Sequence, residues 1–310
     1  MLNVVHHADY MAPRPERGTF KFDKYALVME ELRASGAPIT EHSPAPCPRQ
    51  WLEAVHDPVY VDEVFRAQVP RDKERRIGFP VTERIRDRVR HTNGGTWLAA
   101  QLAMEHGYAA NSAAGSHHAL SDTGAGYCVF NDLAVASNRL IAEGDARRIL
   151  IVDLDVHQGD GTASLTAGRD DIATLSIHAE KNFPVRKARS TIDIGLPDDT
   201  GDSGFMAALE KALPKAFERF APDFVYYQAG VDPHIKDKLG RLALSDEGLA
   251  QRDLYVVEQT RARGLPIASA LGGGYGDDQR EVAARHARSM LTMAAANRAF
   301  EPPARVTHAL

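Results

Sequence analysis

Five short apolar runs, each without regular polar alternation, are spaced along this chain. They occupy residues 2–6, 148–155, 172–178, 223–230 and 266–271. Continuous apolar runs of this length are typical of strands that are buried on both faces of a parallel sheet. We therefore expect a parallel sheet that is covered by other elements on both sides.

Amphipathic stretches separate these runs, and their apolar spacing predicts helices. Residues 71–80 are polar and predict an exposed connection, and Pro214 predicts a kink or a split in the helix that contains it. Alternation of strands and helices is typical of an α/β fold. Without a repeat, a low-complexity segment or a break in composition, the chain is predicted to be one domain, 1–310. The predicted helices cover residues 22–34, 51–65, 81–108 (as one or two helices, the second at 95–106), 131–143, 205–220, 246–263 and 281–296.

Composition and charge are those of an ordinary globular protein. Hydrophobic residues make up 44% and charged residues 25% of the chain, and the net charge is −5. This balance argues against a nucleic-acid binder or a membrane-surface protein, and the basic segment 73–90 also carries acids, which favours a solvated face. No apolar run approaches the roughly 18 residues of a membrane span, and no signal peptide is evident. We expect a cytoplasmic protein.

The two cysteines, Cys47 and Cys128, lie far apart and do not have a zinc-binding spacing. Two such residues cannot form a disulfide framework. Cys128 stands in an apolar context, which favours a small buried side chain.

The stretch RILIVDLDVHQGDGT, at residues 148–162, carries the strongest chemical signal. An apolar strand ends there in Asp153, Asp155 and His157, with Asp160 between two glycines. Because side chains alternate along a strand, the first three residues would point to one side at the carboxyl end of the strand. Ligands bind at this end of open α/β sheets, so the stretch predicts half of a divalent metal site.

Other predicted strand ends supply candidates for the second half. A catalytic metal takes about three protein ligands and keeps a position open. Asp155, His157 and Asp232 would supply such a set, which suits Zn²⁺ and also Fe²⁺ or Mn²⁺. The remaining carboxylates, Asp153 and Asp160, would pair with the adjacent His117 and His118 as Asp–His dyads. Ser176, His178 and the GGGY segment that contains Tyr275 follow further strands.

Plainer interpretations stand beside these. A His-His pair is more often incidental than catalytic, and glycine clusters usually serve turns. His178 would pack behind the site, and His234 and Asp237 would belong to a rim loop. Five other histidines are interpreted as structural or surface residues: His6, His7, His56, His106 and His286.

Taken in order, the segments GSHHA, GYCVFND, DLDVHQGDGT, AGVDPH…DKLGRLALS and GGGYG resemble the zinc-dependent histone deacetylase superfamily over roughly residues 50–290. The segments FDKY, HQGDG and SIHAEKNFP look most like class IV and its bacterial relatives. The resemblance implies the arginase–deacetylase fold, a single α/β domain around a mostly parallel sheet of about eight strands.

The resemblance also implies roles for individual residues. Asp155, His157 and Asp232 look like the zinc ligands. His118, backed by Asp160, looks like the general base and acid, and His117, paired with Asp153, looks like its electrostatic partner. Tyr275 looks like the residue whose hydroxyl binds the oxyanion.

A substrate channel and a second ion are implied in the same way. The carbonyl of Gly126 would accept a hydrogen bond from the substrate amide, and Tyr127, Phe183, Leu239 and Gly273 would line the channel. A K⁺ or Na⁺ ion would be held by Asp153, Ser176 and the carbonyls of Asp155, His157 and Ile177. Two positions depart from common patterns: Tyr127 replaces a usual Phe, and Gln158 replaces the second His of class I.

These features predict hydrolysis of an N-acyl amine, most simply N-acetyl-lysine in a peptide or protein. An acetylpolyamine and longer acyl-lysines are alternative substrates. A two-manganese, arginase-like ureohydrolase would need more Asp and His ligands. A non-catalytic acyl-lysine binding module is disfavoured because every catalytic group is present. The sequence predicts no oligomeric state.

Overall fold

The computed structural model describes residues 1–12 and 20–300. Within them, eight strands form one sheet in the order β2-β1-β3-β8-β7-β4-β5-β6, and every neighbouring pair is parallel. The predicted α/β class and parallel sheet are confirmed. The strands are β1 (Leu2–Val5), β2 (Ile39–His42), β3 (Tyr108–Asn111), β4 (Ile149–Asp153), β5 (Ile172–Ala179), β6 (Ile192–Leu196), β7 (Phe224–Gln228) and β8 (Ile267–Ala270).

Three of these strands were not predicted. β2 and β6 are the two edge strands, and they are only partly buried, so their sequences ITEH and IDIGL lack a continuous apolar run. β3 reads YAAN, and alanine and asparagine have weak strand preference. Its place beside β1 and β8 comes from the sheet and not from local sequence.

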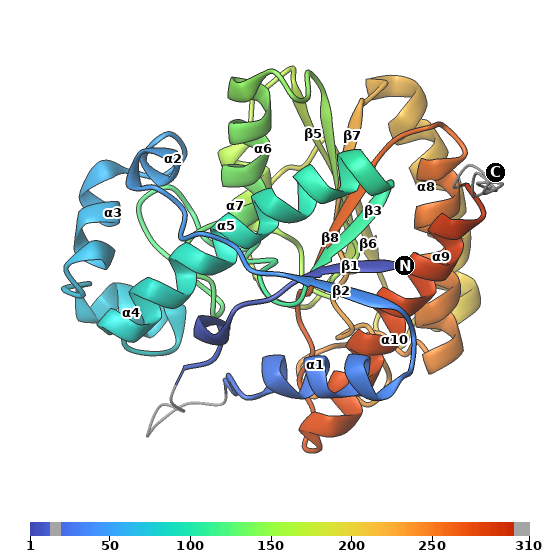
Figure 1. Cartoon of the computed structure of the whole chain (residues 1–310), viewed down its shortest axis with the longest axis horizontal. Coiled ribbons are helices and arrows are strands. Elements are labelled where there is room, and N and C mark those ends of the chain that lie inside the picture. Colours follow the sequence, from blue (N-terminus) through green and yellow to red (C-terminus); the bar gives the residue numbers. More distant parts are fainter. Residues whose placement is uncertain (13–19, 301–310) are drawn as a thin grey trace, which may run out of the picture.

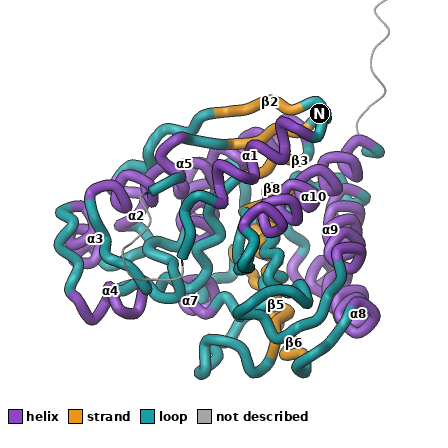
Figure 2. Tube along the Cα trace, turned by 90° about the horizontal axis from the view of Figure 1, so that it is seen from below, coloured by secondary structure: helices purple, strands orange, loops and turns teal. Residues whose placement is uncertain are grey.

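Helices cover both faces of the sheet (Figures 1 and 2). One face packs against α5 and α6, and the other packs against α1, α8, α9 and α10. Alternate residues of β4 serve the two layers: Ile149 and Ile151 belong to the first core, and Leu150 and Val152 belong to the second. These helices are α1 (Lys24–Ala34), α5 (Glu83–His106), α6 (Asp132–Glu143), α8 (Asp202–Phe220), α9 (Asp246–Arg261) and α10 (Gln279–Arg298).

Short helices complete the chain, and α2, α3 and α4 lie together to one side of the sheet (Figure 1). The helix predicted over 51–65 is two helices, because Pro58 begins α3 and Asp57 caps it through the amide of Val59. The segment 71–80, predicted as an exposed connection, is largely exposed but contains a helix that was not predicted, α4, which is capped by Gly78 with a φ of +99°. The short helices are η1 (Ala8–Tyr10), α2 (Arg49–Glu53), α3 (Pro58–Phe65), α4 (Arg71–Ile77) and α7 (Asp160–Leu165).

Two long helices are continuous: α5 takes the one-helix form of its prediction, and α8 lacks the split that was one predicted outcome for it. α5 is one helix, and two of its glycines let other segments pack closely against it. A Cβ on Gly94 would lie 2.1 Å from the carbonyl oxygen of Ala45, and a Cβ on Gly95 would lie 2.0 Å from the hydroxyl of Tyr10. α8 continues through Pro214 without a split. Proline removes one hydrogen bond to Glu210, which is exposed, so water can satisfy the freed carbonyl.

None of the helices within residues 1–12 and 20–300 is long and apolar enough to cross a membrane.

Candidate metal centre

The carboxyl ends of β3, β8, β7 and β4 lie side by side in the sheet. The loops that follow these strands carry the two adjacent histidines, Tyr275, Asp232 and the pair Asp155–His157. This is the edge at which ligands bind in open α/β sheets. The sheet order thus brings together residues that are more than 150 positions apart in sequence.

The strand predicted over 148–155 is shorter than expected. The prediction that strand alternation places Asp153, Asp155 and His157 on one side is therefore wrong. β4 ends at Asp153, so Asp155 and His157 belong to the loop that follows it. The amide of Val156 donates to Asp232 Oδ1 at 2.9 Å, which ties this loop to the loop after β7. Loop geometry, and not strand alternation, aims Asp155 and His157.

Asp155, His157 and Asp232 converge in the interior. Their ligand atoms lie within 4.8 Å of one another, and all three residues are buried. His157 Nδ1 lies 3.1 Å from Asp155 Oδ1 and 3.2 Å from Asp232 Oδ2. Burial and the charge of Asp155 raise the pKa of Asp232 to about 7, so the carboxylates need a compensating cation. Two carboxylates and an imidazole fit a divalent metal of the Zn²⁺, Fe²⁺ or Mn²⁺ type.

Two glycines make room for these carboxylates. A Cβ on Gly230 would lie 2.3 Å from Asp155 Oδ2, and a Cβ on Gly273 would lie 2.0 Å from Asp232 Oδ2. The amide of Gly273 also donates to Asp155 Oδ2 at 2.8 Å. Gly273, expected in the substrate channel, therefore also orients a candidate metal ligand.

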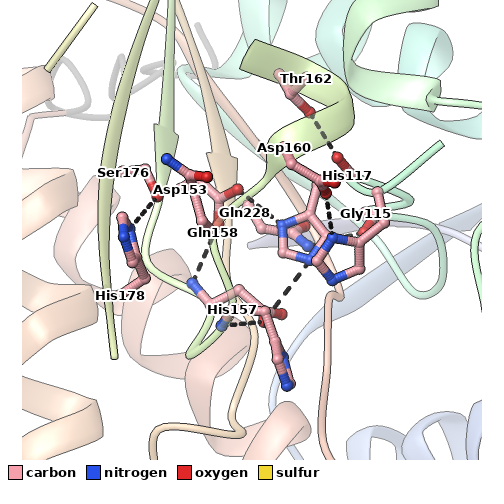
Figure 3. Close-up of polar contacts among 12 residues, drawn as sticks. Gly115, His117, Asp153, His157, Gln158, Asp160, Thr162, Ser176, His178 and Gln228 are labelled. Atoms are coloured by element: carbon pink, nitrogen blue, oxygen red, sulfur yellow. Dashed lines mark hydrogen bonds and ion pairs between the residues drawn. The ribbon is translucent and has the colours of Figure 1, made fainter. Parts of the chain in front are cut away.

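Both predicted Asp–His pairs form beside this group. His117 Nδ1 lies 2.8 Å from Asp153 Oδ2, and His118 Nδ1 lies 2.7 Å from Asp160 Oδ1. The two imidazole rings are 4.0 Å apart. Figure 3 shows His117, Asp153 and Asp160 gathered around the loop after β4.

The two histidines differ in protonation. Burial lowers the pKa of His117, but Asp153 and Asp155 outweigh it and raise that pKa to about 9. Burial and the charge of His117 lower the pKa of His118 to about 4, against the pull of Asp160. At neutral pH, His118 is therefore neutral and can accept a proton, while His117 is a cation.

A cavity of about 400 Å³ connects these groups with the surface. Phe183 and Leu239 are 44% and 40% exposed, so they mark its outer end. The Phe183 ring lies 4.9 Å from that of His118, and the Tyr127 ring lies 5.8 Å from that of Tyr275. Burial raises the pKa of Tyr275 well above its ordinary value, which keeps the hydroxyl protonated as a donor. Every residue expected in the channel lines this cavity: Gly126, Tyr127, Phe183, Leu239 and Gly273.

The residues expected around a monovalent cation lie on neighbouring strands or in the loop after β4. Asp153 pairs in register with Ser176, and Ile177 follows on β5. Ser176 Oγ lies 2.9 Å from His178 Nδ1, and His178 is buried beside it (Figure 3).

Sequence reasoning did not single out Asp132 or Gln228, which hold the loop before the two histidines. Asp132 is fully buried and accepts hydrogen bonds from the amides of Gly115 and Ser116 and from the hydroxyl of Thr96. Gln228 Nε2 donates to the carbonyl oxygen of Gly115 at 2.7 Å. The signal that the sequence offered for Asp132 was an acidic residue that follows an apolar segment at the start of a predicted helix.

Arg252 and Asp253 are a second omission. Both are fully buried, and their side chains form an ion pair at 2.8 Å. Arg252 also donates to the carbonyl oxygens of Leu154 at 3.2 Å and Gly230 at 2.7 Å, which are next to candidate metal ligands. Arg and Asp are common on the exposed side of amphipathic helices, so the sequence did not indicate that this pair is buried beside the candidate metal ligands.

Asp237 was assigned to a rim loop, but it also contacts the loop that carries Tyr275. Its Oδ2 accepts from the amide of Tyr275 at 2.6 Å. Its Oδ1 accepts from the amides of Leu239 at 2.8 Å and Gly240 at 2.9 Å. One carboxylate thus fixes both a channel residue and the tyrosine.

Histidines expected to be structural lie outside the cavity lining. His56 bridges the carbonyl oxygen of Leu120 and the amide of Asn131. His7, Asp9 and His91 form another group with ligand-like spacing. The guanidinium of Arg84 already pairs with Asp9 there, so we assign no metal to it.

Comparison with known proteins gives a consistent match. The Histone deacetylase domain model matches residues 19–291. An uncharacterized protein from Picosynechococcus sp. is 42% identical over 294 residues, which cover 94% of this chain and 97% of that protein. A probable deacetylase from Archaeoglobus fulgidus is 29% identical over 299 residues, which cover 88% of this chain and 80% of that protein.

A solved structure has the same fold. The acetylpolyamine aminohydrolase from Burkholderia pseudomallei superposes with a TM-score of 0.76 and 22% identity, over 94% of this chain and 98% of that chain.

Proposed function

This chain belongs to the histone deacetylase family, and we propose that it is a zinc-dependent amidohydrolase that removes acetyl or other acyl groups from lysine side chains. Water cleaves the amide, R–CO–NH–R′ + H₂O → R–COO⁻ + R′–NH₃⁺. The observation that carries the proposal is one cavity lined by His117, His118, Tyr275 and the metal candidates Asp155 and His157.

Asp155, His157 and Asp232 would hold the zinc ion, which when bound would polarise the amide carbonyl and acidify a water molecule. The other residues act on protons and charge. His118 is neutral and its Nδ1 is engaged by Asp160, so its Nε2 is the nitrogen that takes the proton from the attacking water. Either His118 or the cationic His117 then protonates the leaving amine.

Tyr275 would stabilise the negative charge that develops on the carbonyl oxygen during the reaction. Its protonated hydroxyl would donate to the tetrahedral oxyanion, an interaction typically worth about 3 kcal/mol. The carbonyl oxygen of Gly126 would accept from the substrate N–H and orient the amide. Gly126 has a φ of +53°, which glycine adopts without strain. A Cβ at this position would lie 2.6 Å from His118 Cδ2, so a side chain would displace that ring.

The charges around the cavity favour acyl-lysine in a peptide or protein over an acetylpolyamine. Arg75 and Arg76 are exposed and line the cavity, and a polycationic substrate would be repelled by them. A two-manganese ureohydrolase is also disfavoured. Among the described residues, Asp155, His157 and Asp232 are the only three-ligand group at the cavity.

We also propose a structural K⁺ or Na⁺ ion at Asp153, Ser176 and the carbonyls of Asp155, His157 and Ile177. It would lie behind the zinc ligands and offset the negative charge of Asp153.

A turnover panel tests the main proposal. Purified protein would be assayed with acetyl- to myristoyl-lysine peptides and with acetylpolyamines, with and without a chelator, and its metal content would be measured. We expect about one zinc per chain and chelator-sensitive release of lysine. Two manganese ions per chain, or hydrolysis of guanidino compounds alone, would contradict it.

A further inference from the structure

Two buried cations line the inner part of the catalytic cavity. Lys24 and Arg88 are 3% and 5% exposed, and both belong to the cavity lining. Neither has a carboxylate within 4.0 Å among the residues that the structure describes. Buried charges are normally paired, so two unpaired cations at one cavity call for an anionic partner.

Arg88 is held by one hydrogen bond and by contacts of its guanidinium group with two aromatic rings. Nε donates to the carbonyl oxygen of Tyr10 at 2.8 Å, and the guanidinium lies 5.1 Å and 4.9 Å from the ring centres of Phe22 and Tyr25. These contacts leave the two terminal nitrogens without a protein acceptor among the described residues. The fork of a guanidinium matches a carboxylate with two hydrogen bonds.

Lys24 lies closer to the reacting centre. Its Nζ is 5.4 Å from the ring centre of Tyr275 and donates a long bond of 3.4 Å to the carbonyl oxygen of Gly272. The next residue, Gly273, donates to the candidate metal ligand Asp155. Lys24 is therefore separated from the metal group by a single peptide unit.

The cavity has room beyond an acetyl group. Its volume of about 400 Å³ corresponds to on the order of ten water molecules. The lysine chain of a substrate enters past the exposed Phe183 and Leu239, so the acyl group points toward the buried end. That end is where the unpaired cations lie.

We propose that Arg88 and Lys24 form a carboxylate-binding subsite that selects acyl groups with a terminal carboxylate, such as succinyl and glutaryl. The inference rests on the proposed function and names its acyl class. Hydrolysis of succinyl-lysine consumes one water, breaks the amide C–N bond and yields succinate and the lysine ammonium group. The distal carboxylate is unchanged by the reaction and serves only for recognition.

A matched pair of substrates tests this selection. Succinyl-lysine and succinamoyl-lysine peptides have nearly the same size, but only the first carries a terminal charge. We expect kcat/KM to be at least about tenfold higher for the succinyl peptide, as for a charge-assisted hydrogen bond. Equal values would overturn the subsite and would indicate that the cations only balance the acidic metal ligands.

Variants locate the effect. In Arg88→Met and Lys24→Met, the ratio of succinyl to succinamoyl kcat/KM should fall at least about fivefold. Arg90→Met is the control, because Arg90 stacks on Phe65 at 5.2 Å and is not among the cavity-lining residues, and it should keep the wild-type ratio. An unchanged ratio in both cavity variants would refute the assignment.

Binding separates this inference from the proposed function. If the zinc-loaded protein hydrolysed no acyl-lysine, the proposed function would fail, but the subsite would still be measurable by calorimetry. Succinate should bind to the wild-type protein at least about tenfold more tightly than to Arg88→Met or Lys24→Met. Equal affinity in a folded variant would reject the subsite, and either of the two variants suffices if the other does not fold.

Discussion

Asp237 lies at the rim of the cavity, but we expect its carboxylate to be important for turnover. Among the described residues, its Oδ1 accepts hydrogen bonds from the amides of Leu239 and Gly240, and its Oδ2 accepts one from the amide of Tyr275. In Asp237→Asn, the amide oxygen would take the place that accepts two bonds. The NH₂ group would then face the N–H of Tyr275, donor against donor.

The structure thus predicts a selective loss. One charge-assisted bond, at 2.6 Å in the wild type, disappears, and its removal costs about 1.5–3 kcal/mol. If this cost falls on the placement of Tyr275, kcat should fall by roughly 10- to 100-fold. KM should change less, because Tyr275 acts mainly on the charge of the transition state.

Steady-state kinetics with an acetyl-lysine peptide would measure this, together with metal content and melting temperature. Asp277→Asn is the control, because the Asp277 side chain is 84% exposed and pairs with the exposed Lys238, and it should retain wild-type turnover. Wild-type kcat in a folded, metal-loaded Asp237→Asn protein would refute the reasoning.

Three further predictions concern the site and the stability of the fold. Tyr275→Phe should keep the fold and metal content but lower kcat by about 10²- to 10³-fold, and full activity would refute its role. Asp232→Asn should lower zinc occupancy, measured by elemental analysis after dialysis, because it removes one of the two carboxylates of the proposed zinc site. Burial lowers the pKa of His56 to about 4. The unfolded chain protonates near pH 6.5, so the free energy of unfolding should be full above that pH and fall by up to about 3 kcal/mol toward pH 4. In urea titrations across this range, His56→Gln should remove that part of the dependence, because glutamine can keep both hydrogen bonds, and an unchanged slope would contradict the assignment.

The apolar runs predicted five of the eight strands, because strands buried on both faces must be apolar throughout. The edge strands β2 and β6 carry mixed residues, since one side of each meets solvent or loops. α4 was not predicted because only Ile77 of its seven residues is buried, so no apolar stripe marks it. Elements with little buried surface leave little trace in the hydrophobic pattern.

The candidate site was predicted in its residues but not in its geometry. Asp155 and His157 were grouped by strand alternation, whereas β4 ends before both of them. Their convergence depends on the hydrogen bond from Val156 to Asp232 and on the absence of a side chain at Gly230. Both contacts join segments more than 70 residues apart, which no local pattern reports.

The sequence by itself determined the α/β class and, through its motifs, the family and the chemical groups of the site. These depend on local residue types and on periods of two or 3.6 residues, which are readable along the chain. Only the tertiary structure brought Asp237 under the amide of Tyr275, and Lys24 and Arg88 into the cavity beside the candidate metal group without carboxylate partners among the described residues. The physical reason is that the partner of a buried charge is set by the order of strands in the sheet, which joins residues that are distant in sequence.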